Sequence, residues 1–163
     1  MKIKDIVRLS IVCALYVVLT LVFNFISYGN IQFRVAEILV LLCFFRRDYI
    51  IPVVLGCVIS NLISPMGLID CLFGGVATLA SCVLISYMHN IFISVIFPVV
   101  INGLAIGYEL FYVTDLPFLY STITVAIGEF VVLLIGAFLF NHLKKNRNFM
   151  ELINAKQNYI LEE

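Results

Sequence analysis

The feature that most constrains this chain is a succession of apolar runs separated by short polar turns. Apolar residues make up 63% of the 163 residues and charged residues only 12%, against about 25% charged in an ordinary soluble domain. A mean hydropathy of +1.13 excludes both a water-soluble globule and a disordered chain. At roughly 20 residues per crossing, the chain holds at most about six or seven spans and no separate soluble domain.

Six apolar segments can be delimited, and the first is interpreted as a retained helix because it is too long for a signal peptide. The second has eleven residues and would rise only about 16 Å as an α-helix, too little for ~30 Å of hydrocarbon. Its entrance must therefore be sheltered by protein or lie near the surface. The segments cover residues 6–28, 35–45, 49–63, 68–87, 91–111 and 118–140. The sequence predicts an all-α six-helix membrane bundle over residues 1–143, followed by a polar cytoplasmic tail over 144–163.

Basic residues indicate the orientation. Six crossings place both termini, the second turn and the fourth turn on one side of the membrane. That side carries nine basic residues and the other side carries only Arg34, so the positive-inside rule predicts cytoplasmic termini. The nine are Lys2, Lys4, Arg8, Arg46, Arg47, Lys144, Lys145, Arg147 and Lys156.

Charged and polar residues within or beside the apolar runs are the candidates for a binding site, because such groups are expensive at membrane depth. Five carboxylates face one guanidinium there, which suits a donor-rich or cationic ligand. The alternative is that these side chains only hydrogen-bond helices together. Their convergence favours a site. Its predicted members are Gln32, Arg34, Glu37, Asn61, Asp70, Thr78, Asn102, Glu109 and Glu129, with Asp115 as the fifth carboxylate.

Motifs for chemistry are missing from the sequence. It has no G-x-x-x-x-G-K-[ST] loop for ATP, no H-E-x-x-H and no G-x-S-x-G. Its five cysteines form no C-x-x-C pair and are expected to be apolar packing residues. The chain is therefore not expected to be an enzyme, and neither a metal nor a cofactor is predicted.

Small residues spaced four apart allow close helix approach. Residues 103–107 match G-x-x-x-G, and Ser10 with Ala14 forms a similar step on the first helix. Either pair can serve packing within the chain. The step on the first helix can also meet a partner protein.

The stretches IQFRVAE (31–37), GCVISNL (56–62) and GLID (67–70), with Gly74 and Thr78, resemble the QueT family of queuosine-precursor transporters. Asn102-Gly103, Glu109 and Gly128-Glu129 also look like that family. The resemblance covers most of residues 1–143. It implies a substrate-binding S component of an energy-coupling factor (ECF) transporter in a bacterial cell membrane. Such a subunit captures a 7-deazaguanine near its outer face and works with a transmembrane coupling subunit and two cytoplasmic ATPases.

In that family an A-x-x-x-A step on the first helix meets the coupling subunit, and here Ser10 replaces the first Ala. The ligand is plausible on chemical grounds as well. A deazaguanine edge has two adjacent donors beside a carbonyl, which a carboxylate and an Arg, Asn or Gln can satisfy. An aminomethyl arm would require a second carboxylate. The sequence does not say which carboxylate has which role.

Three other interpretations stay open at this point. The chain can be an S component for another vitamin or nucleobase, or a self-sufficient proton-coupled carrier or channel that uses Glu109 and Glu129. A purely structural membrane protein is a third possibility.

Overall fold

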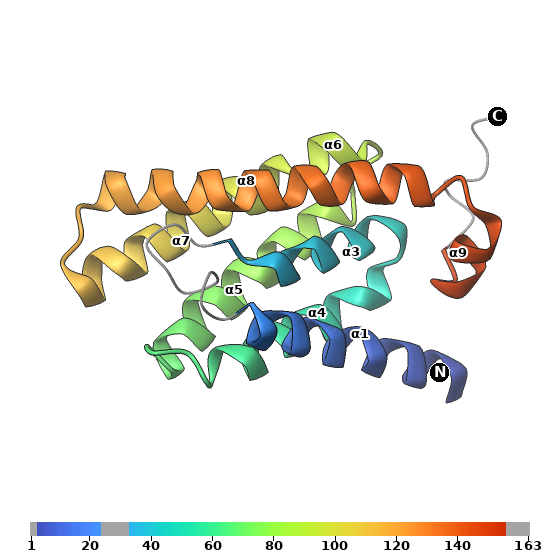
Figure 1. The fold of residues 1–163 in the computed structure, drawn as a ribbon, viewed down its shortest axis with the longest axis horizontal. Helices are drawn as coiled ribbons and strands as arrows, with labels where there is room; N and C mark the ends of the chain where they lie inside the picture. The colour runs from blue at the N-terminus through green and yellow to red at the C-terminus, as the bar shows by residue number, and fades with distance from the viewer. Residues whose placement is uncertain (1–2, 24–32, 156–163) are drawn as a thin grey trace.

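The computed structural model describes residues 3–23 and 33–155, and within them it contains helices and turns but no strand. The helices run along a common axis and form one elongated bundle (Figure 1). The chain is therefore all-α, as predicted. In order, the elements are α1 (Ile3–Val22), η1 (Val35–Leu41), α3 (Leu42–Phe45), η2 (Arg47–Tyr49), α4 (Ile50–Asn61), α5 (Leu68–Ile85), α6 (Ile91–Ser94), α7 (Ile96–Thr114), α8 (Phe118–Leu143) and α9 (Arg147–Leu152).

Four stretches in the described ranges are long and apolar enough to cross a membrane: α1, α5, the pair α6–α7, and α8. Two further apolar segments are shorter. Residues Val35–Phe45 form one of them, and α4, with 12 residues, is the other. Their short lengths agree with the sequence prediction.

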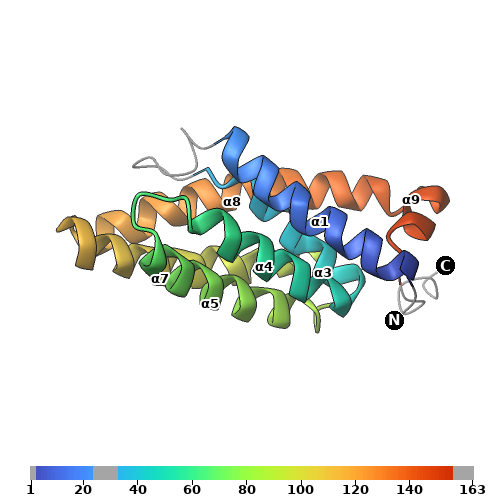
Figure 2. The same cartoon turned by 90° about the horizontal axis from the view of Figure 1, so that it is seen from below.

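The segment Val35–Phe45 is the interior element of the bundle. Its first seven residues form a 3₁₀-helix, and nine of its eleven residues are buried. It packs against α1, α4, α5 and α8 and lies between α1 and α8 in Figure 1. Seen from below, α1 passes in front of part of it (Figure 2). A 3₁₀-helix rises about 2.0 Å per residue, so the segment reaches only about 20 Å. Because protein surrounds it, its ends need not meet lipid.

The segment predicted over residues 91–111 is interrupted at Val95, between α6 and α7. Pro98 has no N–H to donate to the carbonyl of Ser94, so the helical ladder breaks one turn before the proline. Asn90 caps α6, since its side chain accepts a hydrogen bond from the Phe92 N–H at 2.9 Å. The predicted apolar segment is thus built from two helical pieces, and together they form one candidate span, Ile91–Thr114.

The C-terminal helix α9 packs against the end of the bundle where α1 begins (Figure 1). The Phe149 ring lies 6.0 Å from that of Phe140 and 6.5 Å from that of Phe45, between centroids. Tyr49 Oη donates to the Ile153 carbonyl at 2.8 Å, and Ile153 is buried. The first part of the tail thus contributes to the core.

Basic residues from distant parts of the chain gather at this same end. Arg46 forms ion pairs with Asp48 and, at 3.8 Å, with Asp5. Arg8 also pairs with Asp5 and donates to the Leu152 carbonyl at 3.4 Å. The basic start of α1, the turn before α4 and the C-terminal helix therefore share one end of the bundle, as the charge pattern predicts.

Candidate functional site

Eight of the nine predicted site residues lie inside the bundle, and the ninth, Gln32, falls outside the described residues. None of the eight has more than 6% of its surface exposed. Asp115, at the C-terminal end of α7, is exposed, so it does not belong with the other four carboxylates. The buried eight are Arg34, Glu37, Asn61, Asp70, Thr78, Asn102, Glu109 and Glu129.

The first group of site residues joins the start of η1 to α4 and α5. Arg34 Nη2 lies 3.9 Å from Asp70 Oδ1, which is an ion pair but too long for a hydrogen bond. Asn61 Nδ2 donates to the Asp70 backbone carbonyl at 3.0 Å. Three elements thus bring a guanidinium, a carboxylate and an amide together.

Gly74 makes room for this group. A Cβ on Gly74 would lie 2.5 Å from Asn61 Nδ2 and 3.5 Å from Arg34 Nη1. Asp70, Gly74 and Thr78 are all buried on one face of α5, as their spacing of four predicts. The glycine on that face therefore leaves the space that the amide and the guanidinium occupy.

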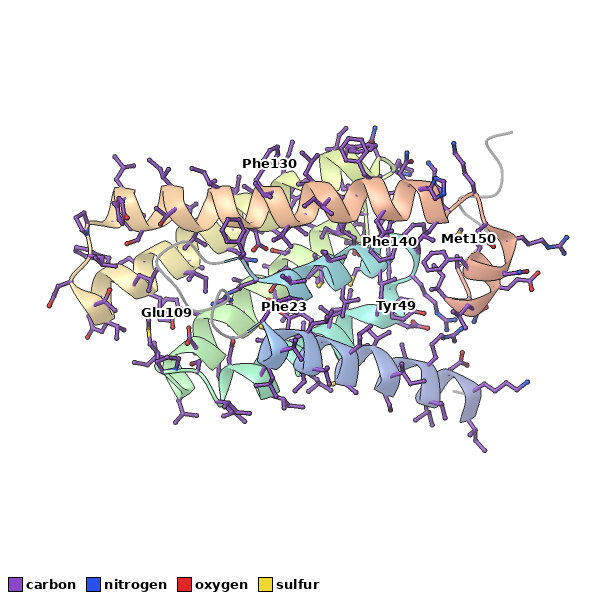
Figure 3. The ribbon with its side chains drawn as sticks, in the orientation of Figure 1. Phe23, Tyr49, Glu109, Phe130, Phe140 and Met150 are labelled. Carbon is purple, nitrogen blue, oxygen red and sulfur yellow. The ribbon has the colours of Figure 1, made fainter. Side chains whose placement is uncertain are left out.

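Glu109, on α7, is fully buried, and neither of its carboxylate oxygens has a hydrogen-bond partner in the structure. Its carboxyl group lies beside that of Asp70. Arg34 Nε and Nη2 are likewise buried without a hydrogen bond. Figure 3 places Glu109 toward the end of the bundle opposite Tyr49, Phe140 and Met150. Unused donors and acceptors therefore lie close together in the interior.

Glu37 is held from α1. Tyr16 Oη donates to Glu37 Oε1 at 2.5 Å, while Glu37 Oε2 is buried without a partner. Tyr16 was not among the site residues predicted from the sequence. The sequence signal that could have found it is the spacing of Val12, Tyr16 and Thr20, four residues apart, which puts them on one face of the helix. These three are the buried residues of α1.

Gly56 allows α4 to lie close to α1 beside Tyr16. A Cβ on Gly56 of α4 would lie 2.8 Å from Tyr16 Cβ and 3.1 Å from the Cys13 carbonyl. Next to Gly56 in the chain, Cys57 accepts hydrogen bonds through Sγ from Thr78 Oγ1 at 3.3 Å and from Asn61 Nδ2 at 3.5 Å. Cys57 was expected only to fill space, and it also organises two site residues.

Glu129 and Asn102 join α8 to α7. Asn102 Nδ2 donates to Glu129 Oε1 at 2.7 Å. The two helices come close because a Cβ on Gly103 would lie 3.1 Å from Ala126 Cβ. One on Gly107 would lie 2.7 Å from the Cα of α8 residue Thr122. The G-x-x-x-G motif therefore serves packing within the chain.

Three buried hydroxyl groups were also absent from the site predicted from the sequence. Ser81 Oγ, Ser121 Oγ and Thr122 Oγ1 have no hydrogen-bond partner in the structure. Hydroxyls in apolar helices usually bond back to their own helix, so sequence gives little warning that these do not. They add donor and acceptor capacity to the interior.

The small-residue step on α1 faces outward. Ser10 and Ala14 are both exposed. Only 17% of α1 is buried, against 44% of each of the other three long spans. The helix that carries the step is therefore the most peripheral of the four.

Four stretches long enough to cross a membrane, around an interior that holds polar groups without hydrogen-bond partners in the described residues, are the features of a small multi-pass membrane transporter. The QueT transporter family model matches residues 6–145, and the chain belongs to this family. The resemblance drawn from its motifs is thereby confirmed, as are its multi-pass membrane nature and its assignment as a transporter.

A relative from Lactococcus lactis subsp. cremoris (strain MG1363) bears the name queuosine precursor transporter QueT. It is 41% identical over 162 residues, which cover 88% of this chain and 94% of the relative. No solved structure matches the chain.

Proposed function

We propose that this chain captures a queuosine precursor, a 7-deazaguanine such as the 7-aminomethyl or 7-cyano compound or queuine, from the outer face of the membrane. The observation that carries the proposal is the buried set of unused donors and acceptors around Arg34, Asp70 and Glu109. A deazaguanine has a flat apolar body and an edge with donors and a carbonyl, so it can satisfy both kinds of group. The name of the Lactococcus relative supports the same ligand.

The ligand site comprises the nine residues predicted from the sequence. A fully buried acceptor or donor favours a ligand that satisfies it and disfavours an analogue that leaves it unpaired. Specificity for deazaguanines over other heterocycles follows from that difference. The nine are Gln32, Arg34, Glu37, Asn61, Asp70, Thr78, Asn102, Glu109 and Glu129.

The chain acts in this proposal as an ECF S component. Its six apolar segments all count as crossings, and both termini lie in the cytoplasm, where the basic residues favour them. Energy comes from two ATPases through a transmembrane coupling subunit, since the chain has no ATP-binding loop of its own. The exposed Ser10 and Ala14 of α1 meet that subunit at close range.

The test combines binding with uptake. Purified protein is titrated with the aminomethyl and cyano deazaguanines and, as controls, with thiamin and riboflavin. Uptake of labelled ligand is then measured in cells with and without the coupling subunit. We expect binding of a deazaguanine only, and accumulation only when the coupling subunit is present.

The alternatives predict other results. Binding of thiamin or riboflavin in place of deazaguanines would indicate an S component for a different nutrient. Accumulation without the coupling subunit would indicate a self-sufficient carrier. Mass spectrometry of small molecules that co-purify gives an independent identification of the ligand.

A further inference from the structure

The four buried carboxylates differ in what the protein already provides for them. Glu37 accepts a hydrogen bond from Tyr16 and Glu129 accepts one from Asn102. Asp70 is paired with Arg34 at 3.9 Å. Glu109 alone among these four has two buried oxygens that receive no hydrogen bond in the structure.

We propose that, within this ligand site, Glu109 is the residue that binds the positively charged amine of the ligand, whereas Glu37 and Glu129, which already accept hydrogen bonds from Tyr16 and Asn102, do not. This assignment rests on the proposed function and specifies one contact within it. It predicts that the preferred ligand carries a protonated primary amine and not only a neutral heterocycle.

The surroundings of Glu109 favour a cation over a base edge. On the same helix its neighbours Ile106 and Leu110 are buried, and both belong to a small apolar cluster with Val125 of α8. A carboxylate in such surroundings interacts strongly with a charge brought into contact, because the local dielectric constant is low. Within residues 3–23 and 33–155 no hydrogen-bond donor reaches its oxygens, so the described side chains leave this position with only acceptors, which an ammonium group requires.

Arg34 and Asp70 provide the complementary position. The pair offers guanidinium N–H donors without hydrogen bonds next to a carboxylate. A donor beside an acceptor fits the mixed edge of a deazaguanine, which presents a carbonyl next to N–H groups. Since Glu109 adjoins Asp70, one small ligand can reach both positions.

Charge balance leads to the same assignment. Arg34 is the only basic residue among the buried polar residues of the described chain, and its ion pair is with Asp70. Glu109 is left next to a second carboxylate with no cation of its own. A ligand ammonium supplies the missing positive charge, whereas a neutral ligand does not.

The experiment compares two ligands that differ in one group, 7-aminomethyl-7-deazaguanine and its 7-cyano analogue, by titration calorimetry of the purified protein. Glu109→Gln keeps the shape and removes the charge. We expect the dissociation constant of the amine to rise roughly tenfold to a hundredfold and that of the nitrile to stay almost unchanged. Glu129→Gln is the matched control, because it is equally buried but already bonded by Asn102, and it should affect both ligands alike.

The outcomes separate the two proposals. If the parent protein binds neither deazaguanine, the proposed function fails. If the parent binds both and Glu109→Gln changes both affinities equally, or neither, the proposed function stands and the assignment of Glu109 is wrong. Should Glu109→Gln not fold, Glu109→Asp is used instead. Glu109→Asp keeps the charge but shortens the side chain by one methylene. It must weaken binding of the amine ligand more than binding of the nitrile ligand.

Discussion

Replacing Gly74 by alanine tests whether the group around Arg34 and Asn61 forms part of the ligand site. The added Cβ would lie 2.5 Å from Asn61 Nδ2, whereas ordinary contacts lie at 3.4–4 Å. The amide must therefore retreat by about 1 Å. Its hydrogen bond to the Asp70 carbonyl is 3.0 Å long, and a retreat of that size breaks it.

The expected effects on stability and on affinity are different in size. Alanine favours the helix over glycine by roughly 0.8–1 kcal/mol, which offsets part of an overpacking cost of about 1–3 kcal/mol. The variant should therefore fold. A displaced Asn61 also loses its proposed hydrogen bond with the ligand, worth about 0.5–1.5 kcal/mol. The dissociation constant for the deazaguanine should therefore be roughly twofold to tenfold higher.

Gly75→Ala is the matched control for this measurement. Gly75 is the next residue of α5 and is also buried, but its Cβ would meet only Val58 Cγ2, at 3.0 Å. Calorimetric titration should show a loss of affinity in Gly74→Ala alone, with thermal unfolding as the test of folding. Parental affinity in Gly74→Ala, or an equal loss in Gly75→Ala, would refute the reasoning.

Three further predictions concern coupling, orientation and packing. Ala14→Leu should abolish uptake and leave ligand binding intact, because a large side chain prevents close helix contact; assembly with the coupling subunit despite that change would place the docking face elsewhere. A cysteine tag at Asp115 should react with an impermeant reagent from outside, whereas tags at Arg47 and Lys145 should not, and external labelling of Arg47 would reverse the orientation. Gly107→Ala should lower the unfolding temperature in detergent, since the new Cβ would lie 2.7–2.8 Å from backbone atoms of α8, at a cost of about 1–3 kcal/mol; an unchanged temperature would show that the two helices separate there freely.

Much of the fold could be predicted because polar residues are costly in lipid and therefore mark where apolar segments end. Residues 35–45 were delimited between Arg34 and Arg46, and the structure has that segment as Val35–Phe45. The same cost explains why the eight predicted site residues that the structure describes are buried: a charge kept within an apolar run must face protein. The break in the helix before Pro98 could also have been predicted from the sequence, since proline cannot continue the hydrogen-bond ladder.

The pairing of those residues could not be predicted. Tyr16 and Glu37 are 21 positions apart, and Asn102 and Glu129 are 27 apart, so each contact depends on which helices become neighbours. A tyrosine in an apolar helix is ordinarily a packing or interface residue. Its bond to Glu37 appears only once α1 lies against the interior segment, and for this reason the sequence left the roles of the four carboxylates undecided.

The interior segment explains how a small bundle can keep charges at depth. The Glu37 N–H donates to the Arg34 carbonyl at 2.9 Å, so a tight turn joins the two residues at the start of the segment, where Arg34 is the N-cap. The sequence spacing predicted a shared helical face, but Arg34 precedes the 3₁₀-helix with φ −77° and ψ 80°. Its side chain pairs with Asp70, whereas Glu37 bonds Tyr16. The helices α1, α4, α5 and α8 pack against the segment, and both Arg34 and Glu37 are buried. A short enclosed segment can therefore hold Arg34 near Asp70 and Glu37 near Tyr16, at a depth where a helix exposed to lipid could not keep either charge.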